Sequence, residues 1–349
     1  MCDLKQLIKI SKYAGMREDL VQAGGGNSSI KVSSEKMLIK ASGYQLADMT
    51  ETDGYAVVNP SVIVDFFKKM PLDKVKKEDE KILLDLAYIE GRRPSIETFL
   101  HSITGKVTLH THAVLVDIMV TRKNGMEILK KMFPKALFVP YATPGIELAV
   151  EYFRSYQNNG EKKSNIVFLQ NHGLIVSAET DIDVIKKTEE ILCTIAKYLH
   201  IDYRKYSDST LLHEILSGCG LSDYIVFQVQ NRKVHQAYEN IGRHIWKHTI
   251  CPDCVVYCGS EFLEIEEDRE EEIIHNFINK YGCPVVMLYR KQFYIVSTGV
   301  KKAKEIESML AFSAEIIEVN NGHEISYLSD EEKVFLLNWD AEKYRKNMK

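Results

Sequence analysis

The chain of 349 residues lacks a marked excess of either charge, because 45 Lys and Arg stand against 49 Asp and Glu, for a formal net charge of -4. Acidic and basic residues are mixed along the chain, so no basic patch indicates binding to nucleic acid or to an anionic membrane surface. A small anionic substrate remains compatible with this composition, since a local site can be positive within a mildly acidic protein.

Long apolar runs are also missing. The first 15 residues space Leu4, Leu7, Ile8 and Ile10 as an amphipathic helix does, but lysines interrupt them, so the continuous apolar region of a secretory signal is absent. The longest uncharged run, residues 164–178, contains two asparagines, a glutamine and a histidine, and is too short and too polar to cross a bilayer. We therefore expect a cytoplasmic protein without membrane association.

Three further features are absent: a cysteine framework, internal repeats and a dinucleotide-binding motif. The seven cysteines are an odd number and their contexts do not demand disulfides, which agrees with a reducing compartment. No G-x-G-x-x-G motif follows a predicted strand, so we expect no nicotinamide cofactor.

The first two hundred residues do contain a mixture of helical and strand patterns without long linkers. Strand patterns outnumber helical ones and several are joined by tight turns, which indicates a mixed or antiparallel sheet flanked by helices. Helices are predicted at residues 2–23, 95–104 and 181–200, among others. Residues 207–221 resemble a transition to a second unit, in which residues 255–259 are predicted to form a strand.

Three histidines carry the clearest chemical pattern. His110 and His112 are two residues apart on a predicted strand, so both side chains project from one face of the sheet. His172 lies between two apolar strands, where Gly173 permits the backbone to bend. Three imidazoles with an open fourth position are typical of a catalytic zinc site. Each histidine alone could equally be a buried sheet residue bonded to a neighbour, and spacing does not show that the three converge.

Glu97 has two interpretations. It falls in the first turn of the helix predicted at residues 95–104, where the helix dipole favours a carboxylate for structural reasons alone, and the local sequence favours this interpretation. The alternative is a general base beside a metal, because proton abstraction next to a carbonyl needs a carboxylate within reach of the carbon.

Small-residue turns offer possible anion contacts. The GGGN segment at residues 24–27 could simply shape a hairpin, or could let backbone amides and the Asn27 side chain approach an anionic oxygen closely. A similar turn, ASG, occupies residues 41–43, and the helix start at Ser95 is a third candidate.

These motifs occur together in one order: GGGN at 24–27, ASG at 41–43, PSIE at 94–97, HTH at 110–112 and NHG at 171–173. Over residues 1–210 the set resembles the class II aldolase/adducin family. The resemblance implies a catalytic α/β domain built as a three-layer α/β/α sandwich with a central, largely antiparallel sheet, assembled as a homotetramer. Residues 221–349 resemble the extra region of long bacterial rhamnulose-phosphate aldolase/dehydrogenases, without the dehydrogenase, and are expected to form a smaller C-terminal α/β domain.

The resemblance assigns roles to eight residues. The metal ligands, for Zn²⁺ or another divalent metal, are His110, His112 and His172. The catalytic residue is Glu97. The substrate or phosphate contacts are Asn27, Ser42, Gly43 and Ser95. One position departs from the family pattern, because Ile96 stands where short family members commonly have a second serine, and this removes one hydroxyl from the phosphate site.

The activity implied by the resemblance is zinc-dependent, reversible cleavage of a ketose, expected as a ketose 1-phosphate, to dihydroxyacetone phosphate and an aldehyde through an enediolate. Glu97 would move the proton at the nucleophilic carbon and Asn27 would hold a substrate oxygen. Sugar-phosphate 4-epimerases and a dehydratase of the family use similar metal chemistry and are alternatives. A non-catalytic adducin-like binding protein is a further alternative, against which the three histidines and Glu97 argue.

A second cluster has metal-like spacing. The series H-x2-C-x2-C-x3-C, formed by His248, Cys251, Cys254 and Cys258, could bind zinc. Residues 255–257 have the pattern of a strand with apolar neighbours, and the long relatives lack these cysteines. We therefore expect no second metal site.

Overall fold

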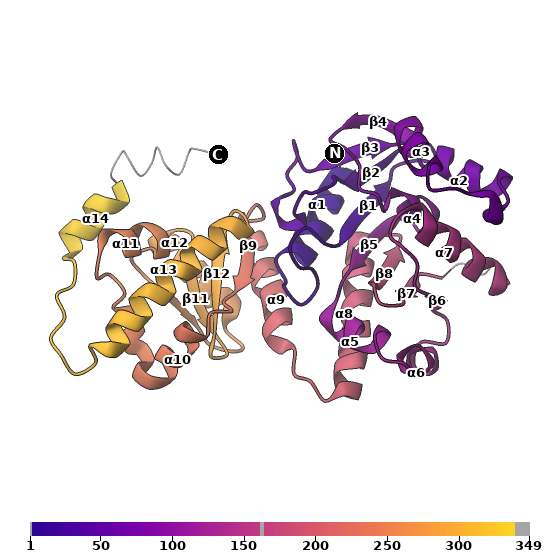
Figure 1. The fold of residues 1–349 in the computed structure, drawn as a ribbon. Coiled ribbons are helices and arrows are strands. Elements are labelled where there is room, and N and C mark those ends of the chain that lie inside the picture. The colour runs from indigo at the N-terminus through magenta and orange to yellow at the C-terminus, as the bar shows by residue number, and fades with distance from the viewer. Residues whose placement is uncertain (1, 161–163, 339–349) are drawn as a thin grey trace. The chain divides into compact units, whose positions relative to one another are not determined.

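The computed structural model describes residues 2–160 and 164–338 and divides into two compact units, Met1–Tyr203 and Arg204–Lys349 (Figure 1). Within the described residues, the first unit contains an eight-stranded sheet of order β4-β3-β2-β1-β5-β8-β7-β6. Every neighbouring pair is antiparallel except β6 and β7. Its strands are β1 Asn27–Lys31, β2 Met37–Lys40, β3 Tyr55–Val58, β4 Tyr88–Gly91, β5 Val107–Thr111, β6 Leu137–Val139, β7 Ile166–Leu169 and β8 Gly173–Ala178.

Helices cover both faces of this sheet. Their bounds are α1 Cys2–Gly15, α2 Pro60–Lys69, α3 Asp79–Ala87, α4 Thr98–Ile103, α5 Val114–Val120, α6 Gly125–Met132, α7 Ile146–Asn158 and α8 Asp181–Leu199, with short 3-10 turns η1 Leu46–Asp48 and η2 Leu72–Lys74. One apolar core joins the sheet to α1, α5, α6 and α8, and the other joins it to α2, α3, α4 and α7. Neighbouring strand residues serve opposite cores, as Phe168 and Leu169 do.

The second unit is a smaller α/β structure. Within the described residues its sheet has the order β10-β11-β12-β9, in which β10 and β11 are parallel and the other neighbours antiparallel. Its elements are α9 Arg204–Gly218, β9 Ile225–Gln228, α10 Arg232–Ile241, η3 Gly242–Trp246, α11 Pro252–Cys258, β10 Leu263–Ile265, α12 Glu270–Tyr281, β11 Val286–Tyr289, β12 Gln292–Ser297, α13 Val300–Val319 and α14 Asp330–Asn338. The two units together confirm the predicted fold class, a three-layer α/β/α sandwich with a largely antiparallel sheet plus a smaller α/β unit.

Four predicted elements need correction in the structure. Helix α1 ends at Gly15, where the backbone lies so close to Ala47 that a β-carbon would be 2.1 Å from its nitrogen. Residues 95–97 form a turn before α4 instead of its first turn. Residues 207–221, predicted as a transition, lie mostly within α9.

The fourth correction concerns residues 255–259, predicted as a strand. Residues Pro252–Cys258 form helix α11, in which Pro252 occupies a first-turn position that proline tolerates. Val255 and Cys258 are both fully buried and lie three residues apart on one helix face. A short apolar run does not by itself distinguish a buried helix from a strand, which explains the wrong prediction.

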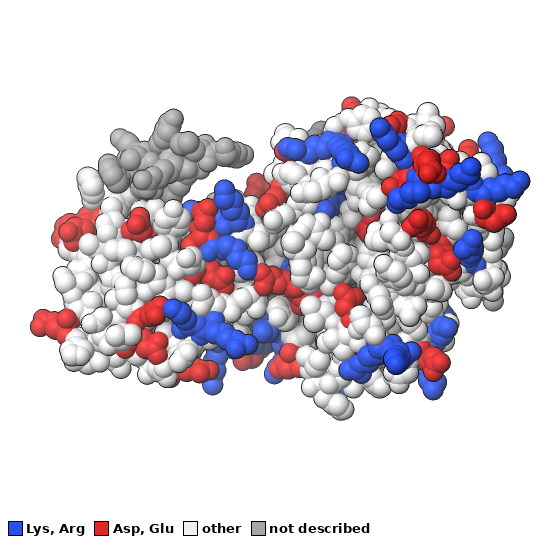
Figure 2. Space-filling view, viewed as in Figure 1, with Lys and Arg blue, Asp and Glu red and all other residues white. Residues whose placement is uncertain are grey.

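Surface charge follows the composition. On the face of the molecule shown in Figure 2, acidic and basic side chains are interspersed over both units. No helix of the described residues is long and apolar enough to span a membrane.

Candidate functional site

Strand register places two of the predicted site residues side by side. Asn27 at the start of β1 pairs with His110 of β5, and His110 in turn pairs with Ile175 of β8. His112 follows the last residue of β5 and its ring centroid lies 5.1 Å from that of His110. Although β5 ends at Thr111 and helix α5 begins at Val114, the two imidazoles that were predicted to share one strand face do lie together.

His172 reaches the same place through the turn between β7 and β8. Gly173 has φ +140°, and a β-carbon there would lie 2.3 Å from the carbonyl oxygen of Thr111, so only glycine permits this approach. The ring centroid of His172 lies 4.9 Å from that of His110 and 5.3 Å from that of His112. The turn thus completes a cluster of three histidines.

Glu97 joins the three histidines from the turn before α4. Its Oε2 accepts hydrogen bonds from His110 Nδ1 at 2.7 Å and from Asn27 Nδ2 at 2.6 Å, and its Oε1 lies 3.1 Å from His172 Nε2. One ligand-type atom from each of Glu97, His110, His112 and His172 lies within 4.8 Å of the other three. Among the described residues this is the one His/Cys/Asp/Glu group found close enough to hold a metal ion.

The residues of the cluster fit a metal ion. His110 Nε2, His112 Nε2 and His172 Nδ1 are buried, and no hydrogen-bond partner for them occurs in the described part of the chain. Buried polar atoms normally have partners, so unpaired ring nitrogens in one cluster indicate a group that would satisfy some of them. Three imidazoles and a carboxylate form a donor set that zinc accepts.

Electrostatics within the cluster follow from burial and close packing. Burial acts to raise the pKa of Glu97, but the His110 charge and the hydrogen bonds from His110 and His172 outweigh it and hold the pKa well below its usual value. Burial and the neighbouring histidine charges lower the pKa of His112 to about 4. His112 is therefore neutral near pH 7, as a metal ligand must be.

The glycines before Asn27 lie against the histidines. Gly26 has φ +72°, and a β-carbon there would be 2.5 Å from Val21 Cγ1 and 3.0 Å from the carbonyl oxygen of His110. A β-carbon on Gly25 would lie 2.9 Å from His112 Nδ1. These glycines permit the loop to pack directly on the cluster, and so do more than shape a hairpin.

The remaining predicted contacts come from two segments that meet. Ala41 and Pro94 form a bridge, the Ser42 amide donates to the Arg93 carbonyl at 2.8 Å, and the Ser95 amide donates to the Lys40 carbonyl at 3.3 Å. Ser95 is buried and its Oγ accepts from the Glu97 amide at 3.3 Å, whereas Ser42 and Gly43 are exposed. The structure therefore brings the ASG turn against the segment that carries Glu97.

Lys40 is a residue that the sequence analysis missed. Its side chain is 2% exposed, and Nζ donates to the carbonyl of Gly24 at 3.0 Å. Burial lowers the pKa of Lys40, while the charge of Glu97 acts in the opposite direction. The sequence feature that could have identified Lys40 is its place at the end of an apolar strand, directly before the ASG turn.

His101 differs from the three clustered histidines. Its Nδ1 lies 2.7 Å from Ser29 Oγ, and burial lowers its pKa to about 3. It is thus held as a neutral partner of β1.

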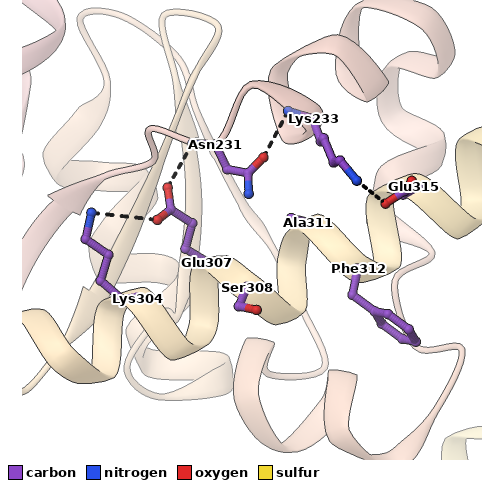
Figure 3. Close-up of a pocket in the computed structure, with 8 residues that line it drawn as sticks. All are labelled: Asn231, Lys233, Lys304, Glu307, Ser308, Ala311, Phe312 and Glu315. Atoms are coloured by element: carbon purple, nitrogen blue, oxygen red, sulfur yellow. Dashed lines mark hydrogen bonds and ion pairs between the residues drawn. The ribbon is translucent and has the colours of Figure 1, made fainter.

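The second unit contains a groove of about 360 Å³ between α10 and α13 (Figure 3). Its charged side chains pair with one another: Lys233 with Glu315 at 2.6 Å and Lys304 with Glu307 at 4.0 Å. Glu307 also accepts from the backbone amides of Gln230 and Asn231. Because these charges are paired within the groove, we place the candidate functional site in the first unit.

Comparison with known proteins assigns the family. The family described as Class II Aldolase and Adducin N-terminal domain matches residues 5–193, so the chain belongs to the class II aldolase/adducin family. No curated protein sequence matches the chain.

Solved structures that are similar to this chain include the following three. The chain is similar to the N-terminal class II aldolase domain of a conserved protein from Thermoplasma acidophilum, with 23% identity, 56% of this chain and 93% of that chain covered, and a TM-score of 0.49. It is similar to an L-fuculose 1-phosphate aldolase, with 19% identity, 57% of this chain and 85% of that chain covered, and a TM-score of 0.41. It is also similar to a sugar-phosphate aldolase from Thermotoga maritima, with 14% identity, 56% of this chain and 94% of that chain covered, and a TM-score of 0.40.

Proposed function

We propose that the protein is a divalent-metal-dependent aldolase that reversibly cleaves a ketose 1-phosphate to dihydroxyacetone phosphate and an aldehyde. The observation that carries the proposal is the contact of the Glu97 carboxylate with two of the three clustered histidines. His110, His112 and His172 would hold the metal, which we expect to be Zn²⁺. Family membership supports the reaction class.

A bound metal ion would supply Lewis-acid stabilisation of the negative charge that develops on the substrate's carbonyl oxygen. Glu97 acts at carbon: in the cleavage direction it delivers a proton to the carbon that loses the aldehyde fragment, and in the condensation direction it removes that proton. Asn27 orients Glu97 through its Nδ2. Its buried Oδ1, unpaired within the described residues, is free to accept a hydrogen bond from a substrate hydroxyl.

The substrate's phosphate group would bind where the ASG turn meets the segment before Glu97. Ser42 and Gly43 offer exposed groups there, and Ser95 contributes a backbone turn close to the carboxylate. Ile96, which is 38% exposed, supplies no hydroxyl at this place. The Lys40 ammonium, which interacts electrostatically with Glu97, would provide the positive charge that offsets this loss.

We further propose that the first unit, predicted as residues 1–210, forms the catalytic part and that the protein works as a cytoplasmic homotetramer. The family assignment of residues 5–193 supports the first statement. Light scattering of the purified chain measures the assembly directly, and a monomeric, fully active protein would contradict the tetramer.

The proposed activity is tested with the zinc-loaded protein and a panel of ketose 1-phosphates and their unphosphorylated forms. Release of dihydroxyacetone phosphate is followed with a coupled reductase, and the aldehyde is followed separately. We expect cleavage of at least one phosphorylated ketose. Interconversion of isomers without release of fragments would assign a 4-epimerase instead, and a purified protein that binds no metal would favour an adducin-like binding role.

A further inference from the structure

Two cysteines of the second unit lie in contact without a bond between them. Cys251 immediately precedes helix α11 and Cys254 lies in its first turn, in the sequence Cys-Pro-Asp-Cys. Their sulfur atoms are 3.3 Å apart, compared with about 2.0 Å in a disulfide bond. A small movement of one side chain therefore suffices to join them.

The two thiols differ in access. Cys251 is half-buried, whereas Cys254 is fully buried. Burial, together with the hydrogen bond and the charge of Cys251, raises the pKa of Cys254 to about 12. Cys251 is thus the sulfur that an external reagent reaches, and Cys254 reacts only with a partner already at Cys251.

Metal binding does not account for this cluster. His248 is fully buried, and its Nδ1 and Nε2 lie 3.1 Å and 2.6 Å from the carbonyl oxygens of Trp246 and Gly259. Each ring nitrogen therefore faces a backbone carbonyl oxygen, and the nitrogen that carries the proton donates to it. Cys258 is fully buried and its thiol is directed to the carbonyl of Ile306 at 3.9 Å. The histidine of the H-x2-C-x2-C-x3-C series is unavailable as a ligand, which leaves the close pair Cys251 and Cys254.

We propose that Cys251 and Cys254 form a reversible redox site that exchanges with small-molecule disulfides. Cys251 loses its proton to solvent, and its thiolate attacks one sulfur of the reagent disulfide, which forms a mixed disulfide and releases one thiolate. Cys254, after losing its proton to solvent or to this thiolate, attacks the Cys251 sulfur and releases the second thiolate, and the two released thiolates take up the two protons. The protein dithiol is oxidised by two electrons and one reagent disulfide is reduced to two thiols.

The full chain is incubated with oxidised glutathione and then examined by intact mass and peptide mapping. We expect the loss of two alkylatable thiols per chain, mapped to Cys251 and Cys254, and their return with dithiothreitol. Cys254→Ser and Cys254→Ala should each accumulate a stable glutathione adduct on Cys251. Cys251→Ser should leave Cys254 unmodified.

Matched controls are Cys219→Ser and Cys283→Ser, which alter half-buried thiols of the same unit and should leave the oxidation unchanged. Glutathione adducts on the wild-type chain without loss of both thiols would overturn the proposal. So would an unmodified Cys251 in both Cys254 variants. A lower zinc content in Cys251→Ser than in the wild-type chain, measured by elemental analysis, would show that Cys251 binds a metal. The redox site would then be replaced by a metal site.

Discussion

The Oε2 atom of Glu97 lies 2.7 Å from Nδ1 of His110. The two residues come from different elements, a turn before α4 and strand β5, and both are buried. A buried carboxylate in contact with an imidazole is an arrangement that can hold a metal and move a proton at the same place.

Replacement of Glu97 by Gln should abolish most catalysis without removing the metal. The amide keeps the size of the side chain but cannot take or deliver the proton, so we expect kcat to fall by about 10²- to 10⁴-fold. Metal content by elemental analysis should stay near that of the wild type, because three histidines remain. Glu90→Gln, an exposed position on β4, is the matched control. Normal turnover by the Glu97 variant would remove this residue from its proposed role.

Replacement of Lys40 by Met should weaken the binding of phosphorylated substrate. The variant keeps the buried stem of the side chain and loses its charge, and hydrogen bonds to charged groups are worth about 1.5–3 kcal/mol, or roughly 10- to 100-fold in affinity. We expect KM to rise for a ketose phosphate and to change little for the unphosphorylated sugar. Lys36→Met changes an exposed lysine near the same strand and serves as the control. An equal effect on both substrates would show that Lys40 supports the fold and does not contribute to phosphate binding.

The histidine pair was predictable from sequence because strand alternation is a local property. His110 and His112 share a face whatever the strand pairs with. Convergence of His172 depends on the pairing of β5 with β8 across more than sixty residues, which local spacing does not contain. The family resemblance anticipated that convergence through the HTH and NHG motifs.

Other features were missed for identifiable physical reasons. The importance of Lys40 is not apparent from the sequence, because it comes from the burial of its side chain beside Gly24. The pattern of residues 255–257 fits a strand as well as a buried helix, so the proline at the start of α11 was the better indicator. Cys251 and Cys254 were considered in the sequence only as possible zinc ligands, and their contact depends on the helix that begins at Pro252.

Substitution of Gly173 by Ala should disturb metal binding and lower stability. Alanine rarely adopts φ +140°, and its β-carbon would lie 2.3 Å from the Thr111 carbonyl oxygen, so the turn that carries His172 must shift. We expect a loss of about 1–3 kcal/mol in the free energy of unfolding and a weaker affinity for zinc in a competition titration. Gly24→Ala, where an added β-carbon has open space, should retain both properties. Wild-type zinc affinity in the Gly173 variant would show that the close approach is not required.

Substitution of Arg17 by Met tests a buried ion pair of the first unit. The Arg17 side chain is fully buried and binds Asp19 with two hydrogen bonds of 3.0 Å and 2.7 Å, and it also contacts Glu189. Removal of the guanidinium leaves the Asp19 carboxylate buried without its partner, which typically costs about 3–5 kcal/mol. Denaturant unfolding should show a loss of that size, with partial recovery in the Arg17→Met, Asp19→Asn double variant.

The control is Arg269→Met, which removes an arginine that pairs with Glu266 and Glu272 on the surface and should hardly change the midpoint of denaturant unfolding. Equal effects of the two arginine substitutions would show that burial of the Arg17 pair adds nothing to its importance.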